Sequence, residues 1–124
     1  MVSDWHNGGP VDEADYPRQI PVEDTFASWA ADWLDGHLPM IQDKAEQYGS
    51  NSLAELGRTF ARAQGREVRD DAALEIGCML YAKGKIERVL DAMLQERMPS
   101  PDTWTDLAVY ALMARYIQTY GRWP

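Results

Sequence analysis

Apolar residues recur every three or four positions along four stretches of this chain, and glycine, proline and polar residues separate the stretches. This spacing lines up apolar side chains on one face of an α-helix, whereas no stretch shows the pattern of a strand. Four helices with mostly short connections pack by default as a bundle. A chain of 124 residues has room for one core of ordinary size. We therefore predict an all-α fold, a four-helix bundle, in a single domain of residues 22–124.

Residues that start and stop helices indicate the boundaries. Pro39 kinks or divides the first helix, and Ser52 opens a capping-box pattern for the second. Asp70 or Asp71 is expected to cap the third helix, and Ser100, which is followed by proline, the fourth. The predicted helices cover about residues 23–48, 52–64, 70–98 and 101–120.

The third predicted helix has two apolar lines, which is typical of a helix at the centre of its bundle. Gly77 and Gly84 lie seven residues apart on one side of it. Because glycine lowers helix propensity, we expect close approach of a neighbouring helix or a ligand as the compensation. Cys78 is the only cysteine, so it cannot form an internal disulfide, and its apolar neighbours predict a buried thiol.

Negative charge is concentrated at the N-terminus. Residues 1–24 hold six acids against Arg18 alone, a net of −5 out of −8 for the chain. With glycines and prolines among these acids, residues 1–21 are predicted to be an irregular acidic arm. No segment has the basic excess that long nucleic acid requires, so we do not expect such a partner. A small phosphorylated ligand needs only two or three cations or a metal ion.

Location and assembly can also be anticipated. The N-terminus lacks a basic region followed by an apolar run, and no stretch approaches the length of a membrane span. We therefore expect a cytoplasmic protein without a membrane partner. Five Trp, six Tyr and six Met in so short a chain predict exposed apolar surface, and hence a homodimer or higher homo-oligomer.

Charged pairs on three of the predicted helices are candidates for a site. Lys85 and Arg88 lie three apart on one helix face, in line with Tyr81, where they could hold a phosphate or simply form a solvated, ion-paired edge. Asp102 and Asp106 are four apart, so their carboxylates lie one above the other and could share a divalent cation such as Mg²⁺.

A second acidic pair lies near the end of the first predicted helix. Asp43 and Glu46 are three apart there, and together with Asp106 they could complete an acidic site between helices. Surface helices carry such pairs constantly, so each pair alone indicates little. A zinc site is not supported, because no Cys/His ligand spacing occurs.

The stretch Lys85-Ile86-Glu87-Arg88, followed by Asp102-Thr103-Trp104-Thr105-Asp106-Leu107-Ala108-Val109-Tyr110-Ala111, resembles a known pattern. K-x-x-R on one helix and D-x-W-x-D-[LI]-A-x-Y-A on the next are typical of phage and prophage proteins of the nucleotide-modification-associated kind. These are distant relatives of the MazG-like α-helical nucleoside triphosphate pyrophosphohydrolases. Residues 44–49, which end in Tyr-Gly, are similar to a third element of these proteins. The resemblance spans about residues 40–118.

The resemblance implies an oligomeric helical bundle whose acids, drawn from several helices, hold Mg²⁺ and a nucleotide phosphate. It would place the cations of the third helix against the first turns of the fourth. Asp106 follows Trp104 and precedes Leu107 and Ala108, and these apolar neighbours predict that it is partly buried at a seam between helices. The implied catalytic residues are Asp106 and Glu46. Substrate would be bound by Lys85, Arg88, Lys44, Tyr48 and Tyr81, and Mg²⁺ by Asp43, Glu46, Asp102 and Asp106.

Three functions remain open at this point. The first is Mg²⁺-dependent cleavage of a nucleoside triphosphate to monophosphate and pyrophosphate. The second is a phage protein that binds and sequesters a nucleotide or nucleotide-derived signal without cleaving it, because the paired Glu-x-x-Glu and Glu-x-x-Asp motifs of active pyrophosphohydrolases are not complete here. The third is a structural helical protein whose aromatic residues serve interfaces. If the protein is phage-encoded, the host cytoplasm would be its location.

Overall fold

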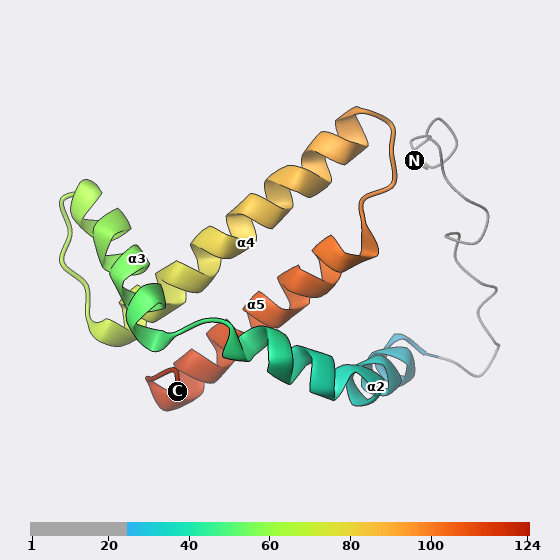
Figure 1. Ribbon diagram of the computed structural model, residues 1–124, viewed down its shortest axis with the longest axis horizontal. Coiled ribbons are helices and arrows are strands. Elements are labelled where there is room, and N and C mark those ends of the chain that lie inside the picture. The colour runs from blue at the N-terminus through green and yellow to red at the C-terminus, as the bar shows by residue number, and fades with distance from the viewer. Residues whose placement is uncertain (1–24) are drawn as a thin grey trace.

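The computed structural model describes residues 25–124, so the predicted arm at residues 1–21 lies outside the described residues. The described part is all-α and forms a four-helix bundle, as predicted. The long helices α4 and α5 run antiparallel, α3 crosses the first half of α4, and α2 lies along α5 (Figure 1). None of these helices is long and apolar enough to cross a membrane. The helices are α2 (Phe26–Glu46), α3 (Ser50–Ala63), α4 (Asp70–Leu94) and α5 (Pro101–Tyr120).

The hydrophobic core lies where α3, α4 and α5 meet. Each of these helices contributes fully buried side chains, whereas α2 contributes none and reaches the core only through partly buried residues of its second half, Ile41 and Ala45. Cys78 is 1% exposed, which confirms the predicted buried thiol. The largest fully buried side chains are Leu53, Cys78, Val109 and Ile117.

Two glycines allow α3 and α4 to touch backbone to backbone. A Cβ on Gly57 would come within 1.9 Å of the Ala73 carbonyl oxygen, and a Cβ on Gly77 within 2.4 Å of the Leu53 carbonyl oxygen. The close approach predicted at Gly77 is therefore confirmed. For Gly84 the prediction is wrong as regards a neighbouring helix, because no described atom of another helix lies within 4 Å of its Cβ position.

The start of α5 and the stop of α3 follow the predicted signals. The Ser100 hydroxyl accepts a hydrogen bond from the Asp102 amide at 3.2 Å, and Pro101 occupies the first helical position. At the end of α3, Gly65 has φ +75°, and the Arg66 amide donates to the Ala61 carbonyl at 2.9 Å, as in a Schellman motif.

Helix α4 ends earlier than predicted, at Leu94 and not at Met98. Glu96 adopts φ +57°, and the Arg97 amide donates to the Ala92 carbonyl at 2.9 Å, which completes the same motif without a glycine. Because glycine or asparagine usually fills that left-handed position, a glutamate there gave no signal in the sequence.

Two helix starts and one N-cap residue also differ from the prediction. Helix α2 begins after Thr25, whose hydroxyl accepts from the Ser28 amide at 3.1 Å, and it continues through Pro39. Helix α3 begins after Gly49, so Ser52 lies inside the helix and does not cap it. Arg69 holds the N-cap position of α4, and the two aspartates expected as caps occupy its first turn, where the helix dipole favours them.

Candidate functional site

Lysines from two helices converge on one carboxylate of a third. Lys44, in the last turn of α2, places its Nζ 2.7 Å from Oδ1 of Asp106, and Lys85 of α4 places its Nζ 2.9 Å from Oδ2. The Asp106 side chain is only 18% exposed. The predicted burial of Asp106 at a helix seam and its proximity to Lys85 are thus confirmed. We call these three residues the lysine–aspartate triad.

The end of α2 is held against the bundle by two further contacts. Trp123, beyond the end of α5, donates its indole N–H to the Tyr48 carbonyl at 2.7 Å, and the Tyr48 side chain packs against the core. An indole N–H and a carbonyl that are both partly buried need such a partner. These contacts fix the chain just after Lys44 and so help to position this lysine.

Three tyrosines pack together beside the triad. The Tyr48 ring meets Tyr81 and Tyr110 edge to face, with ring centroids 5.0 and 5.4 Å away. Tyr81 and Tyr110 stack at 5.9 Å, and the hydroxyls of Tyr48 and Tyr110 share a hydrogen bond. Each aromatic pair of this kind contributes about 0.5–1.5 kcal/mol beyond its buried area. These three rings therefore hold one another in place beside the charged groups of the triad.

A cavity of about 170 Å³ opens between the triad and the tyrosines. Its polar lining comprises ammonium, carboxylate, phenol and amide groups. The lining residues are Lys44, Gln47, Tyr48, Lys85, Asp106, Val109 and Tyr110.

The charges of the triad support one another. Burial raises the pKa of Asp106, but hydrogen bonds from Lys44 and Lys85 outweigh it and bring that pKa below its ordinary value. The hydrogen bond to Asp106 raises the pKa of Lys44 above its usual range. Burial, and then the hydrogen bond with Tyr48, raise the pKa of Tyr110. At neutral pH Lys44 is therefore an ammonium group, Asp106 a carboxylate and Tyr110 a neutral phenol.

The other predicted site residues are not drawn into this cluster. Asp43, Asp102 and Arg88 are exposed, and Glu46 is exposed with its carboxylate accepting from Gln42 at 2.8 Å. Only Asp106 among the predicted acids lines the cavity. Across residues 25–124, no three His, Cys, Asp or Glu side chains come together in a group that could hold a metal ion. The acids expected to bind Mg²⁺ thus do not form a ligand set in this arrangement.

Sequence reasoning did not place Tyr110 or Trp123 in the candidate site. Tyr110 lies four residues after Asp106 and therefore one turn along the same face of α5, a spacing that could have revealed it. No local signal could have paired Trp123 with Tyr48, because 75 residues separate them. Comparison of the chain with family models, curated proteins and solved structures finds no match.

Proposed function

We propose that this chain binds a phosphorylated nucleotide, with a phosphate group between Lys44 and Lys85 and the base against Tyr81. The observation that carries the proposal is the meeting of two lysines beside a polar cavity in a chain with net charge −8. Two ammonium groups against one carboxylate give this cluster a net charge of +1. An entering anion is attracted there, and the partly buried setting strengthens that attraction.

The size of the cavity supports a phosphate as the group that enters. Its volume of about 170 Å³ is below the roughly 300–1,000 Å³ of sites that enclose a whole small molecule. Sugar and base would therefore lie outside it. The neutral Tyr110 phenol adds a hydroxyl that can donate to a phosphate oxygen once its bond with Tyr48 rearranges.

A second hollow supports a position for the base. It has a volume of about 530 Å³ and lies on the α3 side of Tyr81, a residue that is 40% exposed. Stacking of a base on an aromatic ring is worth about 1–3 kcal/mol. Polar side chains around the hollow could bond to the edge of a base. They belong to Asn51, Ser52, Glu55 and Thr59.

The proposal is tested by thermal denaturation with a panel of nucleoside mono-, di- and triphosphates, each with and without Mg²⁺. A ligand present at 100 times its dissociation constant stabilises the folded chain by about 2.7 kcal/mol. Lys85→Met should remove this shift. Lys83→Met is the matched control, because Lys83 is 67% exposed two residues away and pairs with Glu87. The proposal fails if no nucleotide shifts the wild type, or if both variants respond alike.

Cleavage is the stronger form of the same proposal, in line with the family resemblance. Release of pyrophosphate from a nucleoside triphosphate with Mg²⁺ would show it, and Asp106→Asn should then abolish turnover while the helical content is retained. Binding without pyrophosphate release would identify a capture protein. The assay is run both with and without Mg²⁺.

A structural role is the second candidate, and a specific observation favours it. Both carboxylate oxygens of Asp106 are already paired with lysines. That is expected if the triad only fastens α2 to α4 and α5. In that case Asp106→Asn lowers thermal stability, and no nucleotide in the panel shifts either protein.

A further inference from the structure

Among the described residues that line the hollow beside Tyr81, Glu55 alone is charged. Its side chain is 64% exposed, and its Oε2 lies 3.7 Å from Nε of Arg58. Arg58 in turn pairs with Asp70 at 2.9 Å, so the neighbour of Glu55 is itself held in place. Because 3.7 Å is too long for a hydrogen bond, both oxygens of the Glu55 carboxylate can accept hydrogen bonds from a ligand.

The polar residues of this hollow form a line along α3. Asn51, Glu55 and Thr59 are four residues apart, so their side chains lie one above another on one face of the helix. The Asn51 amide and the Thr59 hydroxyl can donate hydrogen bonds, whereas an ionised carboxylate can only accept them. A ligand edge laid along this line therefore meets two acceptor oxygens with a donor on either side.

The edges of the common bases differ in how well they match this order. Guanine has two adjacent donors, N1–H and the 2-amino group, with the O6 acceptor next to N1. Adenine and cytosine have one amino group beside a ring nitrogen whose lone pair would face a carboxylate oxygen. Uracil and thymine have one N–H between two carbonyl oxygens. Proteins read a base through hydrogen bonds to this edge while an aromatic ring stacks on its face.

We infer that the nucleotide bound by this chain carries guanine. Its N1–H and 2-amino group donate to the two oxygens of Glu55, and O6 accepts from Asn51 or Thr59. Tyr81 connects this hollow with the phosphate position, because its ring packs against Tyr48, which lines the cavity of the triad. The inference rests on the proposed function, since it assigns the base of the same nucleotide.

The size of the hollow agrees with a purine nucleoside. Its volume of about 530 Å³ lies within the roughly 300–1,000 Å³ of sites that hold a small molecule. Leu56, which is 37% exposed, adds an apolar side chain to the Tyr81 ring in the lining. A flat base can therefore bury its faces against these two residues while its edge meets the polar line of α3.

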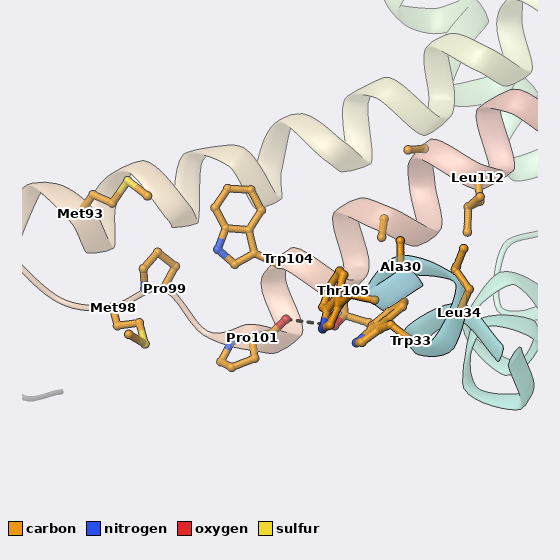
Figure 2. Close-up of a pocket in the computed structure, with 13 residues that line it drawn as sticks. Ala30, Trp33, Leu34, Met93, Met98, Pro99, Pro101, Trp104, Thr105 and Leu112 are labelled. Carbon is orange, nitrogen blue, oxygen red and sulfur yellow. Dashed lines mark hydrogen bonds between the residues drawn. The ribbon is translucent and has the colours of Figure 1, made fainter. Parts of the chain in front are cut away.

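A larger hollow in the described part of the chain lacks the groups that select a base. It is an apolar groove of about 790 Å³ between α2, the end of α4 and the first half of α5 (Figure 2). No charged residue lines it, and the Thr105 hydroxyl already donates to the Pro101 carbonyl at 3.1 Å. A base could stack on the tryptophans of this groove, but its edge would meet neither a carboxylate nor a side-chain amide.

Calorimetry of the full chain with GMP, IMP, AMP, CMP and UMP tests the inference. IMP differs from GMP only in lacking the 2-amino group. It should bind on the order of 10-fold more weakly, because it loses one hydrogen bond to a charged group in a partly exposed site. The other three should bind at least as weakly as IMP, since none of them offers two adjacent donors to the carboxylate.

Glu55→Gln changes the order of donors and acceptors and keeps the size of the side chain. An amide accepts one hydrogen bond and donates another, which suits adenine and not guanine. GMP should therefore lose on the order of 10-fold in affinity and AMP should bind at least as tightly as GMP. Glu67→Gln is the matched control, because Glu67 is 82% exposed, pairs with Arg62 and lies outside the hollow. It should keep the preference for GMP.

Inorganic phosphate separates this inference from the proposed function. It should bind the wild type and both variants alike, because Lys44 and Lys85 are unchanged. Equal binding of GMP, IMP and AMP by the wild type overturns the assignment of guanine and leaves the phosphate position standing. Tighter binding of another nucleotide than GMP, or a preference for GMP that survives Glu55→Gln, does the same. If neither phosphate nor any of the five nucleotides binds, the proposed function fails and this inference fails with it.

Discussion

Asp106→Asn separates the two roles proposed for the lysine–aspartate triad, because it should lower stability and strengthen phosphate binding at once. The amide keeps the shape of the carboxylate, but it has no charge and only one acceptor oxygen. One of the two lysines, which are 33% and 21% exposed, therefore loses its partner. The removed charge no longer competes with an entering anion.

The size of the stability loss can be worked from these contacts. A hydrogen bond to a charged group contributes about 1.5–3 kcal/mol, and partial exposure of both lysines reduces this. We expect Asp106→Asn to lower the free energy of unfolding by about 2 kcal/mol. For a chain of this size the melting temperature should fall by roughly 6–10 °C. Asp43→Asn, on the exposed face of α2, is the control and should stay within about 0.5 kcal/mol of wild type.

The loss should depend on pH with a definite sign. Because the folded pKa of Asp106 is lowered, its stabilisation is present above the unfolded value of about 3.9 and is lost as pH falls through the folded pKa. The pKa of Lys44 is raised, so its stabilisation is present below about 10.4 and is lost as pH rises through the folded pKa. The difference between wild type and Asp106→Asn should be constant from about pH 5 to 9 and shrink on either side.

Urea denaturation across this pH range, followed by circular dichroism, measures the stability difference, and calorimetry with inorganic phosphate measures affinity. Removing one negative charge a few ångströms from a bound anion is worth about 1 kcal/mol or more, which is several-fold in the dissociation constant. Equal stability of the two proteins at pH 7, or an unchanged difference below pH 3, would refute the account of the triad. Weaker phosphate binding by the variant would refute the proposed phosphate position between Lys44 and Lys85.

Three further predictions concern the fold. Gly57→Ala should destabilise the chain by more than about 2 kcal/mol in urea denaturation, because its Cβ would overlap the Ala73 carbonyl, whereas Gly84→Ala, with open space around it, should stabilise by about 0.5–1 kcal/mol. Ser100→Ala should cost about 1 kcal/mol in the same assay through loss of the cap on α5, and Ser100→Asp should restore it. Burial raises the pKa of Cys78 to about 11, so at pH 8 its reaction with a thiol reagent should follow unfolding, and a fast reaction in native buffer would contradict this.

Local signals explain which parts of the fold the sequence predicted. The Ser-Pro start of α5 and the glycine that ends α3 act through neighbouring atoms, so both were predictable. The end of α4 was not, because Glu96 takes a left-handed conformation that its residue type does not favour. Gly57 also gave no signal, since its importance depends on where α4 crosses α3.

The candidate site was predictable only in part, for the same reason. Asp106 stands between apolar neighbours on α5, which indicated a buried carboxylate, and Lys85 was a candidate because it shares a helix face with Arg88 and Tyr81. Lys44 lies 62 residues from Asp106, and their contact depends on how α2 packs against α5. No local pattern in the sequence indicates that packing. Arg88 lies one turn beyond Lys85 but is exposed, because three residues turn a helix by about 300° and leave its side chain about 60° around α4 from that of Lys85.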